Sequence, residues 1–160
     1  MTPSSRQPRL REKLLSQSPT QTRSIAQKLS KEALGGALLL LRGPVGTGKT
    51  TFTQALAKAL GVTDPVRSPT FVLMKSYPAN KRGLKHFIHI DAYRLQGFSD
   101  LAELGGIERI GQSDTLTVVE WPKGKTIDWP NVPTYTMRFT PGAENIRTIV
   151  ITRPRLHTRD

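Results

Sequence analysis

The chain has 160 residues, which suits one domain with a covered central sheet and is too short for two substantial cores. Hydrophobic residues make up 36% and charged residues 22%, and no apolar run approaches the roughly 18 residues of a membrane span, so we expect a soluble protein without a membrane partner. The absence of cysteine excludes disulfides and thiolate chemistry. Because the basic N-terminus carries no apolar secretion signal, we expect a cytoplasmic location.

The charge balance is strongly basic. Lysine and arginine number 24 against 12 acidic residues, which gives a formal net charge of +12. Such an excess often indicates a polyanionic partner, and nucleic acid is the first candidate. Several of the basic residues lie near the ends of the chain, however, and basic tails also keep small proteins soluble. Charge alone therefore leaves both explanations open.

Composition divides the chain into one domain with two tails. Residues 1–12 are rich in proline, serine, glutamine and arginine, so burial of side chains cannot offset the entropy lost on ordering, and we expect a flexible basic tail. Residues 13–153 carry the patterning of a single folded domain. Residues 154–160 are predicted to form a second flexible tail.

The first predicted elements are a helix and a buried strand. Ser18 is suited to cap the helix with Pro19 at its first position, and the pair Gly35 and Gly36 is expected to end it. Residues 37–42, ALLLLR, form an apolar run too short for another helix. Such a run is typical of a strand that is buried on both faces.

A phosphate-binding motif follows this strand. Residues 43–50, GPVGTGKT, match G-x-x-x-x-G-K-[ST] in full, and the apolar residues of 52–60 recur at helical spacing before Gly61. Glycines let backbone N–H groups approach phosphate oxygens, and the helix N-terminus adds a favourable dipole. Lys49 is expected to reach the β- and γ-phosphates and the Thr50 hydroxyl to bind Mg²⁺. The predicted nucleotide-binding residues are Gly43, Pro44, Val45, Gly46, Thr47, Gly48, Lys49, Thr50 and Thr51.

A glycine-rich turn that only connects a strand to a helix would not require lysine followed by threonine.

The chain beyond this helix consists mostly of predicted strands, with short helical pieces at 99–104 and 107–110. The strands are residues 71–77, 85–91, 115–120, 135–140 and 146–152. The last two strands are joined in hairpin style by PGAEN. We therefore predict an α/β protein with the P-loop NTPase fold, a central mainly parallel sheet flanked by helices, and antiparallel C-terminal strands.

A P-loop site also needs an acid near the metal, normally at the end of a neighbouring buried strand. Asp91 and Glu120 each end a predicted strand. An acid at a strand end is often only a solvated group, so the pattern leaves both residues as candidates.

Two nucleotide-dependent classes are disfavoured by the sequence. Guanine-specific GTPases share an N-K-x-D motif, whereas Asn80 and Lys81 are followed by Arg82 and Gly83. A small-molecule kinase usually needs a lid over its acceptor site, and the weakly patterned segment 121–134 is short for one.

Four blocks in order resemble one family: GPVGTGKTTF at 43–52, SPTFVL at 68–73, HIDAYRL at 89–95 and VVEWP at 118–122. Together they resemble TsaE (formerly YjeE), the bacterial ATPase family of tRNA threonylcarbamoyladenosine (t6A) formation. The resemblance runs from about Thr22 to Arg147. The combination of H-x-D-x-Y-R-L with E-W-P after a P-loop is highly specific.

The resemblance implies ATP and Mg²⁺ as cofactors and assigns roles to matching residues. Glu120 falls on the Walker B metal carboxylate, beside Thr50 as the other metal-binding residue. Asp91 is then the candidate for aligning the attacking water, which makes Asp91, Lys49 and Thr70 the expected catalytic residues. Ser68 and Thr70 match a first switch, and the second comprises His89, Asp91, Tyr93 and Arg94. Trp121 is expected beside the nucleotide, although a buried aromatic next to Pro122 would serve the core equally well.

The resemblance also implies partners and leaves alternatives. TsaD and TsaB are the expected protein partners, with tRNA reached indirectly through the complex. The alternatives are a basic tRNA-binding or scaffold module that holds ATP as a structural ligand, and a small P-loop kinase. One departure concerns the loop, where Pro44 replaces a common family aspartate. Phosphate binding at that position acts through the backbone, so we expect it to survive.

Overall fold

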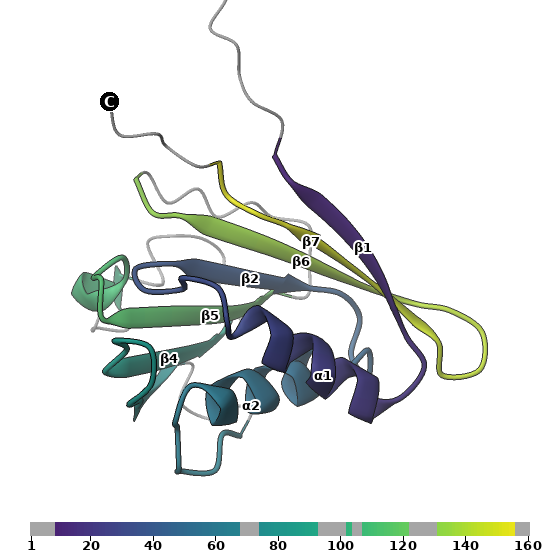
Figure 1. Cartoon of the computed structure of the whole chain (residues 1–160), viewed down its shortest axis with the longest axis horizontal. Coiled ribbons are helices and arrows are strands. Elements are labelled where there is room, and N and C mark those ends of the chain that lie inside the picture. The colour runs from purple at the N-terminus through teal and green to yellow at the C-terminus, as the bar shows by residue number, and fades with distance from the viewer. Residues whose placement is uncertain (1–8, 68–73, 93–101, 104–106, 122–130, 156–160) are drawn as a thin grey trace, which may run out of the picture.

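The computed structural model describes residues 9–67, 74–92, 102–103, 107–121 and 131–155 (Figure 1). Two α-helices are described, α1 (Pro19–Leu29) and α2 (Lys49–Ala59), with one 3₁₀ turn, η1 (Ile107–Arg109). The strands are β1 (Arg11–Ser16), β2 (Leu38–Arg42), β3 (Met74–Pro78), β4 (His86–Asp91), β5 (Thr115–Trp121), β6 (Thr134–Pro141) and β7 (Arg147–Thr152).

All seven strands form one sheet in the order β1-β7-β6-β2-β5-β4-β3. The four central strands β6, β2, β5 and β4 are parallel to one another, whereas β3, β7 and β1 are each antiparallel to the strand they pair with. The β6–β7 hairpin forms where PGAEN predicted it, with the amide of Gly142 bonded to the carbonyl of Ile146 at 2.7 Å. The predicted α/β architecture, with a mainly parallel centre and antiparallel strands at the C-terminus, is confirmed.

The core lies on both faces of β2, because every residue of this strand before Arg42 is buried. Leu39 and Leu41 belong to the larger apolar cluster, which includes the buried sides of α1 and α2. Leu38 and Leu40 belong to a smaller cluster on the other face, against β4, β5 and η1. Both described α-helices pack side by side on one face of the sheet (Figure 1). The sequence therefore predicted the burial of β2 correctly.

Helix α1 begins as predicted but ends earlier. The Ser18 side chain accepts the amide of Gln21 at 3.1 Å, and Pro19 opens the helix. The helix ends at Leu29, before the glycine pair at 35 and 36. After it the chain turns so that the Glu32 carboxylate accepts hydrogen bonds from Tyr135 at 3.1 Å and from Arg153 at 2.6 Å. Because these partners are more than a hundred residues away, local spacing could not reveal the early end.

Strand β1 corrects the predicted N-terminal boundary. Arg11 and Glu12 fall inside the predicted tail, yet all six residues of β1 pair with β7. Leu14 packs against the larger core cluster, and Glu12 forms an ion pair with Arg153 at 2.9 Å. An edge strand of this kind needs few apolar side chains, so its polar composition resembles that of a tail. Residues 1–8 and 156–160, which hold the rest of the two predicted tails, lie outside the described residues.

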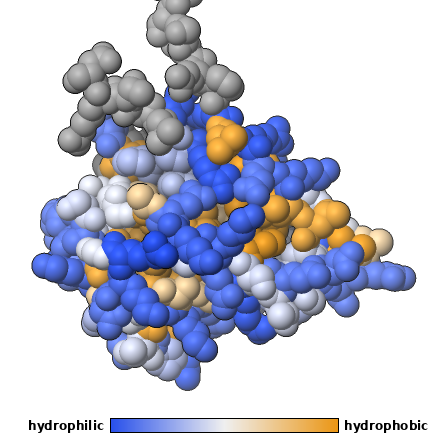
Figure 2. Space-filling model, in the orientation of Figure 1, coloured by the Kyte–Doolittle hydropathy of each residue, from blue (hydrophilic) through white to orange (hydrophobic). Residues whose placement is uncertain are grey.

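The surface in the orientation of Figure 1 is mostly hydrophilic, with smaller apolar areas (Figure 2). Among the residues that the structure describes, three large apolar ones are more than half exposed, namely Leu10, Leu15 and Val45. No helix within the described residues combines the length and apolar character needed to cross a membrane.

Candidate nucleotide-binding site

The phosphate-binding motif forms the connection between β2 and α2. Gly43, Gly46 and Gly48 all have positive φ, at 146°, 81° and 96°, where most side chains are unfavourable. A Cβ at Gly43 would overlap the carbonyl oxygen of Phe139 in β6, whereas one at Gly46 would meet nothing within 4 Å. The loop is therefore shaped by its own backbone and, at Gly43, by close approach to β6.

Lys49 lies beneath this loop as the first residue of α2. Only 8% of its surface is exposed, and its ammonium donates a hydrogen bond to the carbonyl of Gly43. Burial lowers the pKa of Lys49, while the carboxylates of Glu120 and Asp91 act in the opposite direction. A buried cation of this kind gains from an anionic ligand, because the ligand replaces hydration that the amine has lost.

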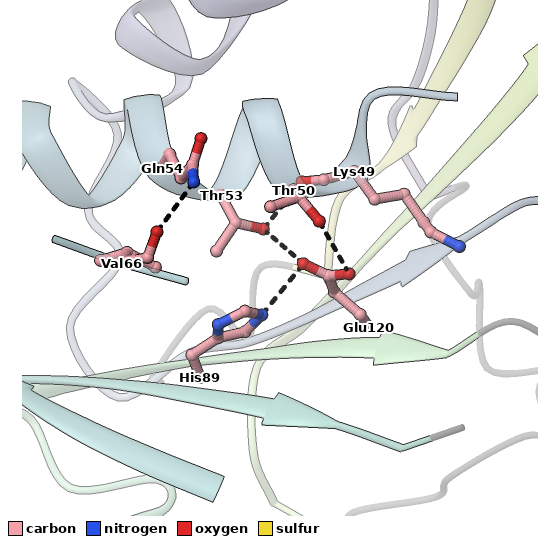
Figure 3. A network of polar contacts seen from close by, with 7 residues as sticks. All are labelled: Lys49, Thr50, Thr53, Gln54, Val66, His89 and Glu120. Atoms are coloured by element: carbon pink, nitrogen blue, oxygen red, sulfur yellow. Dashed lines mark hydrogen bonds and ion pairs between the residues drawn. The ribbon is translucent and has the colours of Figure 1, made fainter. Parts of the chain in front are cut away.

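Glu120 is the penultimate residue of β5 and is held by three neighbouring side chains (Figure 3). Its Oε1 accepts a hydrogen bond from Nε2 of His89 at 3.0 Å and lies 3.4 Å from the Thr53 hydroxyl. Its Oε2 lies 3.5 Å from the Thr50 hydroxyl. Glu120 is 7% exposed and His89 is fully buried. His89 and Thr53 thus fix the position of Oε1, and Oε2 faces the start of α2.

Asp91 lies beside Glu120 on β4, the strand next to β5 in the sheet. It ends β4, and the parallel register sets it directly beside Glu120. Carboxyl ends of parallel strands meet at one edge of a sheet, which explains why two acids far apart in the sequence become neighbours.

A cavity of about 430 Å³ opens over the loop. This volume lies within the range of about 300 to 1,000 Å³ that is usual for small-molecule sites. Cations and anions both line it, namely Lys49 and Arg147 together with Asp91 and Glu120. The full lining consists of Pro19, Val45, Gly46, Gly48, Lys49, Thr50, Thr51, Asp91, Glu120 and Arg147.

Eight of the predicted residues line this cavity, namely Val45, Gly46, Gly48, Lys49, Thr50, Thr51, Asp91 and Glu120. Gly43, Pro44 and Thr47 belong to the loop without lining the cavity, and the Thr47 hydroxyl donates to the carbonyl of Pro44 at 2.7 Å. Trp121 ends β5 in register with Arg42, but its side chain lies outside the described part. Ser68, Thr70, Tyr93 and Arg94 also lie outside the described residues.

Three residues at the site were missed by sequence analysis. Thr53 lies one helical turn after Lys49 and Thr50, so its helical spacing could have indicated it. Arg147 donates from Nη2 to the carbonyl of Gly46 at 3.2 Å, across 101 residues of sequence, and no local signal points to it. Pro19 was predicted only as the start of a helix, and the fold turns that helix end toward the loop.

A metal ion here would have few protein ligands. Among the described residues there is no group of three or more histidine or acidic side chains that could hold a metal. Mg²⁺ does not require one, because it keeps several waters and binds through one or two oxygen ligands plus phosphate. The Thr50 hydroxyl and Glu120 Oε2 offer two such oxygens 3.5 Å apart. The residues present fit this ion.

The site geometry agrees with a comparison against known families. The model of the family described as threonylcarbamoyl adenosine biosynthesis protein TsaE matches residues 16–149. The chain belongs to the TsaE family. Its P-loop, Asp91 and Glu120 all lie within the matched region.

Relatives in several bacteria support this assignment, and each carries the name tRNA threonylcarbamoyladenosine biosynthesis protein TsaE. The Streptomyces coelicolor protein is 41% identical over 103 residues, which cover 64% of this chain and 68% of that protein. The Aquifex aeolicus protein is 40% identical over 114 residues, 70% of this chain and 77% of that protein. The Bacillus subtilis protein is 37% identical over 103 residues, 64% of this chain and 61% of that protein.

A solved structure supports the fold of this TsaE family member. The crystal structure of Bacillus subtilis YdiB matches 92% of this chain and 88% of its own, with a TM-score of 0.67 and 24% sequence identity. At this identity the likeness concerns the fold alone.

Proposed function

We propose that this protein is an ATPase subunit required for t6A modification at position 37 of tRNA, and that it hydrolyses Mg·ATP in the cytoplasm in complex with TsaD and TsaB. It would reach tRNA through that complex and would have no membrane partner. The observation that carries the proposal is the convergence of Lys49, Thr50, Asp91 and Glu120 on one cavity in a chain of the TsaE family. The relatives named above are all called t6A biosynthesis proteins.

The loop and Lys49 would bind the triphosphate. Backbone N–H groups of residues 43–51, except Pro44, which has none, offer donors to phosphate oxygens, and the start of α2 adds a favourable dipole. The Lys49 ammonium, now bonded to the carbonyl of Gly43, would exchange this neutral acceptor for the β- and γ-phosphate oxygens. The exchange places a buried cation against an anion and offsets its lost hydration.

Thr50 and Glu120 would hold Mg²⁺, which when bound neutralises charge on the phosphate oxygens. His89 and Thr53 orient the Glu120 carboxylate, so Oε2 is the oxygen presented to the cavity. Such positioning contacts strengthen a metal site because the ligand pays less entropy when the ion binds.

Hydrolysis would proceed by in-line attack of water on the γ-phosphorus, with ADP leaving and inorganic phosphate released. Asp91, beside Glu120 and on the cavity wall, would align this water, and Thr70 would contribute from the first switch. Trp121 would contact the nucleotide. Lys49 and the loop amides would stabilise the charge that develops on the equatorial oxygens.

Release of inorganic phosphate from Mg·ATP tests the proposal, measured with the protein alone and with TsaB, TsaD and tRNA. We expect the partners to raise the rate. Lys49→Ala should reduce it by about 10²-fold or more, as loss of a preorganised charge-stabilising donor typically does. Lys58→Ala is the matched control, because Lys58 lies in the last turn of the same helix and should leave the rate unchanged.

Two results would contradict the proposal. A phosphorylated acceptor in place of free phosphate would indicate the kinase alternative. ATP binding without hydrolysis in every combination of partners would remove the catalytic role of Asp91 and favour a module in which ATP is a structural ligand.

A further inference from the structure

Three basic residues occupy one row across the sheet, away from the nucleotide cavity. The register pairs Lys13 of β1 with Val150 of β7, Val150 with Arg138 of β6, and Arg138 with Arg42 of β2. We call Lys13, Arg138 and Arg42 the basic row. Adjacent strands are about 4.8 Å apart, so the row spans about 14 Å from β1 to β2.

The basic row lies on the face of the sheet opposite the helices. The residues next to the row members and to Val150 in the sequence face the helix-side core. These neighbours are Leu14, Ile149, Ile151, Met137, Phe139 and Leu41. Successive side chains of a strand point to opposite faces. The row and Val150 therefore point to the other side, where Lys13 and Arg138 are exposed to solvent.

Among the described residues, this face of the antiparallel strands carries positive charge without a compensating acid. Beside the row, β1 contributes Arg11 and Leu15, and the other strands contribute mainly hydroxyl side chains, namely Thr134, Thr136, Thr140, Thr148 and Thr152. The only acid of β1, Glu12, lies on the opposite face and pairs with Arg153. None of the ion pairs among the described residues involves the row.

Arg42 is the member that most needs a ligand. It is half-buried, and its Nε is buried with no hydrogen-bond partner. Burial lowers the pKa of Arg42, and the adjacent charge of Arg138 lowers it further. Two neighbouring guanidinium groups without an acid repel each other, and a buried N–H without an acceptor costs free energy. An anion placed between Arg42 and Arg138 would remove both costs.

We propose that the basic row binds the phosphate backbone of RNA directly. A row about 14 Å long suits several successive phosphates better than a single small anion. Arginine, lysine and threonine hydroxyls are the side chains that commonly contact nucleic-acid phosphates. An acidic protein would be the alternative occupant, but β1, β6 and β7 present only two apolar side chains on this face, Val150 and Leu15, which are too little for the apolar centre of a protein interface.

The choice of RNA over DNA rests on the proposed function, since that role concerns tRNA. The basic row would give a direct RNA contact to a subunit that would otherwise reach tRNA through its partners. Arg42 immediately precedes Gly43, so the row ends one residue before the phosphate-binding loop.

Binding of a labelled tRNA transcript to the full chain, measured by fluorescence anisotropy at several salt concentrations without nucleotide, tests the proposal. Lys13→Glu/Arg138→Glu should weaken binding by at least tenfold, about what two lost phosphate contacts imply, and should flatten the salt dependence. The control Lys28→Glu/Lys81→Glu changes the net charge equally at two exposed residues away from the row. We expect the control to change affinity by less than twofold.

Equal losses in the two double variants would overturn the proposal, because net charge alone would then explain binding. Displacement of tRNA by polyglutamate at the same charge concentration would also overturn it, in favour of an acidic protein partner. Lys49→Ala should keep full tRNA affinity. A failure of the nucleotide assignment would therefore leave this result unaffected, and the two proposals can fail separately.

Discussion

The parallel and antiparallel parts of the sheet use charged residues in different ways. Around β2, β4 and β5, ionisable groups such as Lys49, His89 and Glu120 are buried and hydrogen-bonded at the carboxyl ends of the strands. Around β1, β6 and β7, Lys13 and Arg138 of the basic row are exposed, and neither belongs to an ion pair among the described residues. On the other face Arg153 forms a network with Glu12 and Glu32. Burial fixes geometry in the first part, whereas exposure leaves the second part available for contact.

The contact between the two parts can be broken at Gly43. Gly43→Ala would place a Cβ against the Phe139 carbonyl of β6, in addition to the strain of its positive φ. We expect a loss of about 2 to 4 kcal/mol in unfolding free energy, with nucleotide affinity falling by about 10²-fold or more. Urea unfolding and titration with a fluorescent ATP analogue measure the two effects.

Gly46→Ala is the matched control for this substitution. Its φ is also positive, but its Cβ would meet no atom within 4 Å, so it should cost only about 1 kcal/mol. Equal costs at the two glycines would show that backbone conformation, not contact with β6, shapes the loop.

The acid of the parallel part is tested by Glu120→Gln. The amide keeps the shape and still accepts from His89, but it removes the negative charge beside the Thr50 hydroxyl. We expect Mg²⁺-dependent phosphate release to fall by about 10² to 10³-fold, with metal-free nucleotide binding nearly unchanged. Glu108→Gln, at an exposed residue of η1, serves as the control. Full magnesium-dependent activity in Glu120→Gln would refute the metal role.

We expect a smaller effect, a loss of metal affinity, when the hydrogen bond that positions Glu120 is removed. His89→Ala leaves Glu120 in place but deletes the 3.0 Å hydrogen bond to its Oε1. Metal affinity should fall by about 10- to 100-fold, the usual effect of losing a group that orients a ligand. The magnesium concentration for half-maximal activity measures this shift. If only the unfolding free energy changed, His89 would be a core residue without a positioning role.

The network of the antiparallel part is tested by Glu32→Gln. Burial, followed by the charge and hydrogen bond of Glu32, raises the pKa of Tyr135 to about 12. Because the folded pKa lies above the ordinary tyrosine pKa of about 10, this stabilisation is present below pH 10 and is lost as pH rises toward 12. In Glu32→Gln the pKa of Tyr135 should fall, and stability at pH 7 should fall by about 1 kcal/mol.

Tyrosinate absorbance and urea unfolding follow the two changes in Glu32→Gln. The control Glu144→Gln lies in the exposed β6–β7 turn and should change neither quantity. An unchanged Tyr135 titration would mean that burial alone sets its pKa.

Sequence predicted the parallel part well because its signals are local. The phosphate-binding loop is a contiguous motif, and Asp91 and Glu120 end apolar runs, so the carboxyl edge of a parallel sheet was the natural place for them to meet. Thr50 and Glu120 do come within 3.5 Å. The catalytic roles assigned to Asp91 and Thr70 stay predictions.

The antiparallel part was predicted less completely because its stabilising contacts span the chain. Strand β1 was not predicted, and its first two residues were assigned to the tail, since an edge strand needs little apolar character and its partner β7 is more than a hundred residues away. Arg147 reaches the loop only because the β6–β7 hairpin folds back on it. Alternation within strands still predicts which face each residue takes, once pairing is known.

Arg153 joins the beginning and the end of the chain. Its side chain forms ion pairs with Glu12 and Glu32, and its amide donates to the carbonyl of Leu10 at 2.9 Å. The two ends of the domain therefore leave the sheet side by side, on neighbouring strands (Figure 1). A circular permutant that links residue 155 to residue 9 and opens the chain at the exposed turn around Arg82 should keep the sheet order and leave the P-loop uncut.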